Sequence, residues 1–394
     1  MSRQHALLSA SASARWLQCT AAPQMEAKFP DTTSEFAREG TLAHSIAELK
    51  LRAYAVEPMA KSTYTRHLNN KFKKDELYQP EMDTHTETYL DYIKGILLSY
   101  KTKPYTVVEK RVDFSQYVPR GFGTADCLIM APNELHIVDF KYGKGVPVDA
   151  NNNSQMRLYA LGALNAYQLL YQFKTVHMHI VQPRIQNFSQ ESLGVDILRQ
   201  WAEDVVKPKA QEAMSADGGK FHPGECCRFC RAKAQCKARA EYYAAMADTA
   251  HEKRDMTMIN MTELGQYLTI AKQLKAWADD LQEYGLSCAL KGLNVPGWKC
   301  VEGRGSRAFT DTDAAFKTLI DNGIDESVLY ERVPLTLAKT EKAIGKKLFT
   351  ELVGDYVEKK PGKPTLAPES DKRPPMDLTP KAADVFKKLS LIHI

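Results

Sequence analysis

In the first 250 residues of the chain, hydrophobic and polar residues follow a β-strand pattern in one stretch and an α-helical pattern on both sides of it. Between residues 106 and 140 the chain is rich in Val, Ile, Leu and Phe, and the turn sequences Val-Pro-Arg-Gly and Pro-Asn separate the apolar runs. Short apolar runs bounded by turn residues are typical of β-strands. The pattern predicts three antiparallel strands, at Thr106–Phe114, Gly121–Ala131 and Glu134–Phe140.

Helical periods lie on both sides of these strands. A first helix is predicted at Glu35–Tyr54, with Thr33 or Ser34 as its N-cap. Its apolar face would contain Phe36, Leu42, Ile46 and Leu49. The other predicted elements are helices at Thr84–Ser99, Ser154–Leu170 and Asp196–Met214 and a strand at Val176–Gln182. This order predicts an α/β core with a mixed sheet flanked by helices.

The pattern changes near Lys253, where we place a domain boundary. Apolar residues then recur every three or four positions and predict a long amphipathic helix with Tyr267, Ala271, Leu274, Ala278 and Leu281 on one face. A hairpin is predicted at Trp298–Phe309, and the Pro- and Lys-rich stretch Glu358–Pro375 is expected to be extended or disordered. The predicted organisation is therefore a core at residues 1–250, a mostly helical domain at 251–357 and a tail at 358–394.

Composition adds limits but no specific function. An apolar fraction of 44% and a charged fraction of 26% are ordinary for a globular protein. No apolar run reaches the length of about 18 residues that a membrane span needs, and the N-terminus lacks the apolar region of a secretory signal. We therefore expect a cytoplasmic protein without a membrane partner. Its net charge of +5 permits binding to a polyanion without requiring it.

Two carboxylates and a lysine are expected to converge in the predicted hairpin. Asp126 lies in one strand, and Asp139 and Lys141 lie in the next, across the turn at Pro132-Asn133. Side chains alternate between the faces of a strand, so Asp139 and Lys141 point to the same side. Carboxylates hold Mg²⁺, and a lysine can orient water or stabilise charge, which suits phosphodiester hydrolysis. A structural salt bridge at a strand edge is the alternative interpretation.

Four motifs around this group occur in one order between residues 37 and 159. They are the segment Ala37–Glu48 around His44, the G-x-x-D of Gly123–Asp126, the D-x-K of Asp139–Lys141 and the Q-x-x-x-Y of Gln155–Tyr159. Together they resemble the motifs of RecB-like nucleases of the PD-(D/E)XK class. The resemblance implies that His44, Asp126 and Asp139 bind Mg²⁺ or Mn²⁺ and that Lys141 is catalytic. It also implies that Gln155 and Tyr159 line the site against DNA.

Each of these residues also has a simpler interpretation. A single histidine such as His44 is often an ordinary helix residue, and Gln155 and Tyr159 could cap and pack their helix. Their spacing of four residues does place them on one helix face. Glu109 lies one strand earlier and could approach the metal, although a surface position is the simpler expectation for it.

Short cysteine spacings indicate a second metal site. Cys227, Cys230 and Cys236 form C-x₂-C-x₅-C, with Cys226 adjacent as an alternative to Cys227. In a reduced compartment such spacings are typical of metal ligands, and zinc is the usual metal. Cys19 is the candidate for a fourth ligand.

The arrangement of one N-terminal cysteine and three cysteines after the nuclease core resembles the iron–sulfur centre of AddB-type and CRISPR-adaptation nucleases. The resemblance implies a [4Fe–4S] cluster held by these four cysteines, with Zn²⁺ as the alternative. The isolated cysteines Cys127, Cys288 and Cys300 are expected to be small buried residues. Five basic residues near the cluster are expected either to bind DNA phosphates or to form a solvated helix face: Arg228, Arg231, Lys233, Lys237 and Arg239.

The whole chain also resembles a family encoded by phages and prophages. We therefore expect a metal-dependent DNA nuclease, an exonuclease more readily than an endonuclease, that acts on single- or double-stranded ends in a bacterial host cell. Phage recombination proteins are the expected partners. A non-catalytic DNA-binding module on a retained nuclease scaffold is the alternative, and intact Asp126, Asp139 and Lys141 argue against it.

Overall fold

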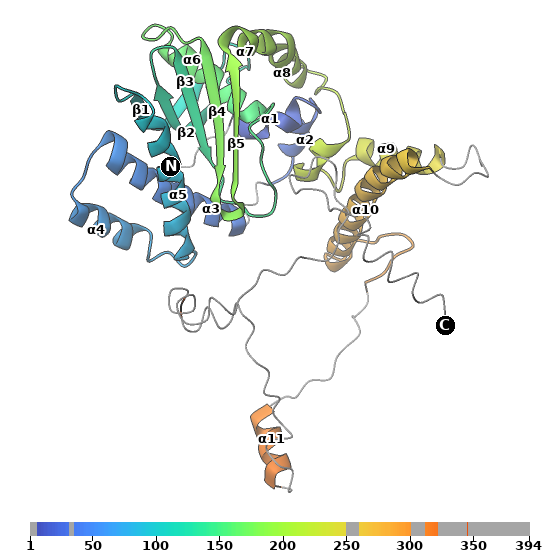
Figure 1. Cartoon of the computed structure of the whole chain (residues 1–394). Helices are drawn as coiled ribbons and strands as arrows, with labels where there is room; N and C mark the ends of the chain where they lie inside the picture. Colours follow the sequence, from blue (N-terminus) through green and yellow to red (C-terminus); the bar gives the residue numbers. More distant parts are fainter. Residues whose placement is uncertain (1–5, 31–34, 250–259, 301–311, 322–344, 346–394) are drawn as a thin grey trace, which may run out of the picture. The chain divides into compact units, whose positions relative to one another are not determined.

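The computed structural model describes residues 6–30, 35–249, 260–300, 312–321 and 345 (Figure 1). The chain divides into two compact units, Met1–Val301 and Glu302–Ile394. The boundary predicted near Lys253, the predicted hairpin beyond Cys300 and the whole tail lie outside the described residues. The helix described in the second unit is α11 (Thr312–Asp321).

A five-stranded mixed sheet forms the centre of the first unit, with its strands in the order β1-β2-β3-β4-β5 (Figure 1). The strands are β1 (Tyr105–Asp113), β2 (Phe122–Met130), β3 (Glu134–Phe140), β4 (Thr175–Gln182) and β5 (Asn187–Gly194). The first three form an antiparallel meander, β4 is parallel to β3, and β5 is antiparallel to β4. The predicted meander and the fourth strand are confirmed.

The hydrophobic pattern does not predict β5. Its sequence, NFSQESLG, contains no β-branched residue and few apolar ones. Because β5 forms an edge of the sheet, most of its side chains are exposed or half-buried. An edge strand of this composition has the same sequence signature as a loop.

Helices cover both faces of the sheet. The helices of the first unit are α1 (Ser13–Trp16), α2 (Ala22–Glu26), α3 (Glu35–Leu51), α4 (Lys61–Lys71), α5 (Glu81–Leu98), α6 (Ser154–Tyr167), α7 (Val195–Trp201), α8 (Lys207–Ala213), α9 (Lys237–Thr249) and α10 (Met261–Leu290). The predicted helix at Asp196–Met214 is present as α7 and α8, joined by a π turn at Ala202–Val206. The N-cap predicted at Thr33 or Ser34 lies outside the described residues.

Each face of the sheet carries its own apolar layer. Leu135 and Ile137 of β3 belong to the layer that packs against α6, α7, α8 and the N-terminal Trp16. Val138 and Phe140 belong to the opposite layer, which packs against α3 and α5. Because β3 is buried on both faces, its apolar residues point to both sides of the sheet, as expected for an inner strand with helices on both sides.

One residue of the first predicted helix does not lie where the pattern placed it. Phe36 was expected on the buried face of α3, but its side chain is 79% exposed. The buried residues of this helix begin at Leu42. Ile46 is fully buried, so the predicted apolar face is correct from the second turn onward.

The long predicted helix is present as α10. The side chain of Asn260 accepts hydrogen bonds from the first turn and Glu263 bonds back to the Asn260 N–H, which makes a capping box. No residue of α10 is buried, and Tyr267 is 54% exposed. The ring of Trp277 stacks on Tyr243 of α9, with centroids 5.5 Å apart. The helical period is thus confirmed, whereas its apolar face is not covered by the described part of the chain.

Candidate metal-binding cleft and cysteine pocket

A cleft of about 540 Å³ opens between α3, β1, β2, the end of β3 and α6. Its lining includes every residue that the nuclease-like motifs singled out: His44, Asp126, Asp139, Lys141, Gln155 and Tyr159. These residues come from two helices, from two neighbouring strands and, for Lys141, from the position directly after β3. The fold therefore brings the four motifs to one place.

Three possible metal ligands meet at the centre of the cleft. One ligand atom from each of His44, Glu109 and Asp126 lies within 4.8 Å of the other two. Nδ1 of His44 is 3.5 Å from Oδ1 of Asp126. The other oxygen of Asp126 accepts a 2.8 Å hydrogen bond from the backbone N–H of Phe140 on the neighbouring strand, which fixes the carboxylate. Two carboxylates and an imidazole form a donor set that suits Mg²⁺ or Mn²⁺.

Glu109 reaches this group because β1 changes face at this position. Val108 belongs to the apolar layer under α3 and α5, whereas Val112 belongs to the opposite layer. Residues four apart in a regular strand share a face, so the alternation must break between them. Glu109 has φ +52°, a left-handed conformation that non-glycine residues rarely adopt. The break in the strand therefore falls at Glu109.

The same break occurs on the adjacent strand. Cys127 lies in the layer under α3 and α5, and Ala125 lies in the opposite layer, so β2 changes face at Asp126. The register pairs Val108 with Cys127 and Lys110 with Ala125, which places Glu109 opposite Asp126. Strained backbone of this kind is concentrated at functional sites. Here it brings two acidic side chains from neighbouring strands to the same point.

A hydrogen-bonded network occupies the other side of the cleft. The ammonium of Lys141 is 3.0 Å from Oδ2 of Asp139, whose side chain is 4% exposed. Lys141 also donates to Oε1 of Gln155 at 3.2 Å. The amide of Gln155 donates to Oδ1 of Asp139 at 3.4 Å and to the hydroxyl of Tyr159 at 3.1 Å. Gln155 and Tyr159 thus share one face of α6, as their spacing predicts.

Gly123, the first residue of the G-x-x-D motif, makes room for Tyr159. A Cβ atom at Gly123 would lie 2.5 Å from Cε1 of the Tyr159 ring, closer than two carbon atoms can approach. The glycine therefore allows α6 to pack closely against β2. This contact gives a physical reason for glycine at the start of the motif.

Burial and neighbouring charges shift the pKa values in the cleft in different directions. Burial raises the pKa of Asp139, although Lys141 opposes this effect. Burial would also raise the pKa of Asp126, but His44 and the Phe140 N–H bring it below its usual value. Burial acts to lower the pKa of His44, and the Asp126 carboxylate outweighs it and raises that pKa. The two acids therefore have unlike environments, as acids with separate tasks do.

Burial and neighbouring charges also set the pKa of Lys141. Burial acts to lower the pKa of Lys141, but Asp139 and then Asp126 raise it above its ordinary value. The amine is therefore held in its charged form beside the two acids. A buried ammonium that is paired in this way can donate hydrogen bonds into the cleft.

Two cleft residues are not among the sequence-predicted ligands. Glu109, for which a surface position was the simpler expectation, is half-buried within the cleft. Arg111 also lines the cleft, and its guanidinium lies 3.8 Å from the centre of the Phe122 ring. The sequence contains one slight sign that Glu109 faces the cleft. Lys110 occupies a position where strict alternation from Val108 would place an apolar residue. That interruption marks the strand break at Glu109.

A second pocket lies between residues 15–25 and residues 221–236. Five cysteines line it: Cys19, Cys226, Cys227, Cys230 and Cys236. All five are free thiols. The structure therefore brings Cys19 to the C-x₂-C-x₅-C segment, which follows more than 200 positions later.

Polar contacts hold the two walls of the cysteine pocket together. Glu26 pairs with Arg15 at 2.8 Å and accepts the backbone N–H of Arg231 at 2.9 Å. The hydroxyl of Thr20 accepts the backbone N–H of Lys220 at 2.8 Å. The pocket therefore has a defined backbone on both sides.

The thiols of this pocket differ in acidity. The Cys226 thiol lowers the pKa of Cys227 to about 6 through a hydrogen bond. Burial raises the pKa of Cys230 to about 11 and also raises that of Cys19. Thiolates are ligands for zinc and iron–sulfur clusters, and four or more of them on one pocket make a suitable donor set for either.

The remaining cysteines do not all fit the expectation that they are buried. Cys127 is fully buried in β2, as predicted. Cys288 is half-buried and Cys300 is exposed, so the prediction is wrong for these two. Cys288 belongs to α10, none of whose residues is buried, and Cys300 follows that helix, so no core surrounds either of them.

The basic residues near the cysteines do not form one patch either. Arg239 is 3% exposed and pairs with Asp280 of α10 at 2.7 Å, and Lys233 pairs with the same carboxylate at 2.7 Å. Both predicted roles, DNA contact and solvated helix face, are therefore wrong for Arg239, which joins α9 to α10. Arg228 and Lys237 are exposed.

Fold and site together define a mixed α/β protein with a five-stranded sheet flanked by helices and an acidic, lysine-containing cleft. The chain belongs to the family described as "Protein of unknown function (DUF2800)", whose profile matches residues 5–374. Among solved structures, the "Crystal structure of SSO0001" matches 53% of this chain and 99% of that chain, with 12% identity and a TM-score of 0.21. A likeness of that size says nothing further about the site. No helix among the described residues is long and apolar enough to cross a membrane.

Proposed function

We propose that this chain is a metal-dependent deoxyribonuclease of the RecB-like PD-(D/E)XK class. One observation carries the proposal: His44, Glu109 and Asp126 meet beside the Asp139–Lys141 pair in a single cleft. A surface salt bridge would need only Asp139 and Lys141. It would not need the breaks in β1 and β2 that turn Glu109 and Asp126 toward this pair. The donor set matches what metal-assisted phosphodiester hydrolysis requires.

The cation would be held by His44, Glu109 and Asp126. Asp139, which the motifs assign to the metal, pairs with Lys141 and would lie beside these ligands. When bound, Mg²⁺ or Mn²⁺ would supply a Lewis acid that acidifies water and neutralises charge on the phosphate. The break at Glu109 supports this assignment, since it brings a further carboxylate to Asp126 and Asp139 in the cleft.

The residues around the metal would each have a separate role in hydrolysis. Lys141 keeps its proton, so its ammonium would orient the attacking water or stabilise negative charge on the phosphate. Gln155 contacts both Lys141 and Asp139 and would hold them in place. Tyr159 supports Gln155 from the next turn of α6. Arg111 would contact a phosphate of the DNA from the lining of the cleft.

The cysteine pocket would carry a second group that has no part in the hydrolysis. We propose a [4Fe–4S] cluster held by Cys19, Cys227, Cys230 and Cys236, with tetrahedral Zn²⁺ as the alternative. The meeting of Cys19 with the three later cysteines in one pocket supports either group. Such a group would tie the N-terminal segment to the end of the core.

The biological setting we propose is the processing of DNA ends during phage recombination in the cytoplasm of a bacterial host. The substrates would be single- or double-stranded DNA ends, and phage recombination proteins would be the partners. This setting rests on the resemblance of the whole chain and on the chemistry of the cleft.

The deciding assay uses the purified full chain with end-labelled single- and double-stranded DNA, in Mg²⁺, Mn²⁺ or EDTA. We expect release of labelled fragments that depends on the metal and is absent in Asp139→Ala protein. Binding of DNA without any release, at either metal, would instead support a non-catalytic DNA-binding module. Release in EDTA at the same rate would contradict the metal-dependent mechanism.

A further inference from the structure

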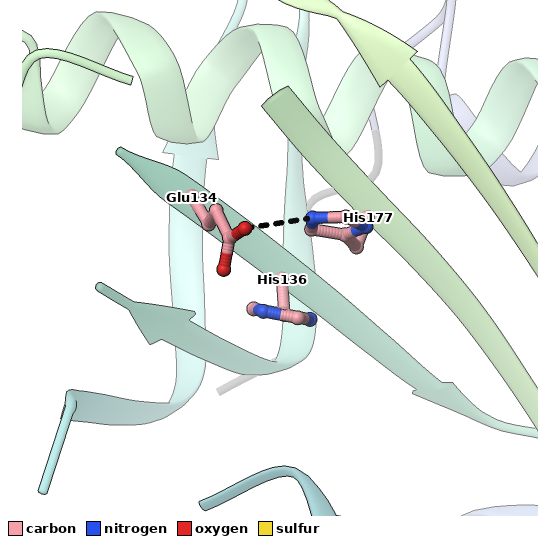
Figure 2. A group of neighbouring side chains, drawn as sticks. All are labelled: Glu134, His136 and His177. Atoms are coloured by element: carbon pink, nitrogen blue, oxygen red, sulfur yellow. Dashed lines mark ion pairs between the residues drawn. The ribbon is translucent and has the colours of Figure 1, made fainter. Parts of the chain in front are cut away.

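A second group of possible metal ligands lies at the other end of β3. Glu134 and His136 come from β3 and His177 comes from β4, as Figure 2 shows. One ligand atom from each lies within 4.8 Å of the other two. His136 and His177 occupy paired positions of the parallel strands, and their rings stack with centroids 4.6 Å apart.

This group is separate from the cleft. None of its three residues lines the cleft, and Glu134 lies five residues before Asp139 along the strand, a distance of about 17 Å. His136 alternates with Leu135 and Ile137 and so lies on the α5 face of the sheet, whereas Asp139 lies on the α6 face. The two groups can therefore act independently.

The imidazole of His177 has one nitrogen engaged and one without a hydrogen bond. Its Nδ1 is 2.8 Å from the hydroxyl of Ser192 on β5. Its Nε2 is buried and has no hydrogen-bond partner among the described residues. The nearest acid is Glu134, whose Oε1 is 3.9 Å from this nitrogen (Figure 2). A buried polar atom without a partner is costly and calls for an explanation.

The imidazole of His136 is held in the same way. Its Nδ1 is 3.0 Å from Nε2 of His179, whose other nitrogen is 3.0 Å from the hydroxyl of Tyr92. Its Nε2 is 2.7 Å from the hydroxyl of Tyr100, which also hydrogen-bonds to Glu134. The Nε2 atom and the carboxylate therefore converge on one point.

Both imidazoles thus have an outer partner at Nδ1. Nε2 of His177 faces Glu134, and Nε2 of His136 is joined to Glu134 through the hydroxyl of Tyr100. Histidines that bind metals nearly always use their second nitrogen in this way, because the outer hydrogen bond fixes the ring and its tautomer. A purely structural cluster would explain the stacking of the rings. It would not explain why Nε2 of His177 lacks a hydrogen bond.

We propose that Glu134, His136 and His177 bind Zn²⁺. Two imidazole nitrogens and one carboxylate oxygen are a recurring zinc donor set, whereas Mg²⁺ and Ca²⁺ prefer oxygen ligands throughout. The Glu134 side chain is 41% exposed, so the ion can reach the site from solvent. Bound there, the ion links β3 to β4, two parallel strands whose connection runs through α6.

The test is zinc binding by the full chain, measured by calorimetric titration and by the zinc content after dialysis. The variants are His177→Ala, Glu134→Gln and Ser192→Ala, and His67→Ala on the exposed face of α4 is the control. We expect His177→Ala to bind one Zn²⁺ fewer per chain than wild type. Glu134→Gln and Ser192→Ala should weaken that same site by about 10- to 100-fold, and His67→Ala should match wild type.

A metal is also proposed for the cysteine pocket, so zinc binding at Glu134, His136 and His177 must be told apart from binding there. Co²⁺ in place of Zn²⁺ does this, because thiolate ligands give a charge-transfer band in the near ultraviolet that imidazole and carboxylate ligands do not give. The band should be unchanged in His177→Ala protein. The readout is metal binding alone, so the result does not depend on whether the chain cleaves DNA.

Equal zinc stoichiometry and affinity in wild type and His177→Ala protein would overturn the proposal. If His177→Ala does not fold, Glu134→Gln decides, because this half-exposed side chain can lose its charge without a change in shape. Wild-type zinc affinity in Glu134→Gln protein would then overturn the proposal in the same way. A weaker site in that variant supports it.

Discussion

The cleft and the cysteine pocket are built in different ways. The cleft is formed by neighbouring strands and the two helices that pack against them, and its polar groups bind one another inside a rigid sheet. The cysteine pocket is formed by two short segments without strands, residues 15–25 and 221–236, that meet from distant parts of the chain. The cleft thus receives its shape from the sheet, whereas the pocket lies between two segments that are distant in sequence.

This difference predicts opposite results of mutation. Removing a group from the cleft should abolish chemistry and leave the sheet intact. Removing a ligand from the cysteine pocket should destabilise the fold and alter chemistry only as a result. Four experiments test this contrast.

The largest expected effect is on cleavage by Lys141→Ala protein. The ammonium is the paired cation beside Asp139, and loss of a comparable transition-state donor in other enzymes reduces turnover by about 100- to 1,000-fold. The melting temperature should stay within a few degrees of wild type. Lys144→Ala, at an exposed position three residues later, is the control. Cleavage at the wild-type rate by the Lys141 variant would remove this residue from the site.

Cys19→Ala should cause the largest loss of stability. Wild-type protein purified without oxygen should be brown and contain about four irons per chain if the group is a [4Fe–4S] cluster. The variant should lose the metal, and its free energy of unfolding should fall by more than about 4 kcal/mol, because the cross-link closes a very long loop.

Cys300→Ser at an exposed position is the matched control for Cys19→Ala and should keep both colour and stability. One zinc and no iron in anaerobic wild-type protein would change the identity of the group but not its role. A soluble and fully metallated Cys19→Ala protein would contradict the role itself.

Glu109→Gln should have an intermediate effect, confined to the cleft. The carboxylate would lose its charge while the side chain keeps its shape, so binding of Mn²⁺ should weaken by at least about tenfold. A calorimetric titration with Mn²⁺ measures this, with Glu57→Gln at an exposed position as the control. An unchanged Mn²⁺ isotherm would show that the strand break does not serve the metal.

Gly123→Ala should cause a modest loss of stability. The added methyl group must displace the Tyr159 ring, and overpacking of this kind costs about 1–3 kcal/mol. Gly95→Ala on α5 is the control: its Cβ meets no atom within 4 Å, so the change should stabilise the helix by about 0.5–1 kcal/mol. Chemical denaturation of both variants measures the difference. A Gly123→Ala protein as stable as wild type would mean that α6 can move away from β2.

The sequence predicts the sheet better than it predicts the sites. The runs that form β1 to β4 are apolar and bounded by turns, so their positions follow from local patterns. The polar edge strand β5 has no such pattern, and the exposed Phe36 shows that a helical period does not say where a helix leaves the core.

Within the sites, spacing along the chain predicts which residues share a face but not how far a strand departs from regularity. Asp139 and Lys141 share a face because a strand alternates, and Gln155 and Tyr159 share one because a helix turns. The left-handed conformation of Glu109 follows from contacts across two strands, so no local rule gives it. Glu134, His136 and His177 lie on neighbouring strands separated in sequence by a whole helix, and only the pairing of β3 with β4 brings them together.

Cys19 lies in one pocket with residues 227–236, so the N-terminal segment can complete its folding only after those residues have been synthesised. At a translation rate of about 5–20 residues per second, the N-terminal segment must wait about 10–40 s for its partner to be made. During that time Trp16, which is 1% exposed in the folded chain, has no complete core to enter. We therefore expect nascent chains halted before residue 221 to be cleaved readily by protease near Trp16, and chains that extend past residue 236 to resist cleavage there. Equal resistance at both lengths would show that the N-terminal segment folds without its partner.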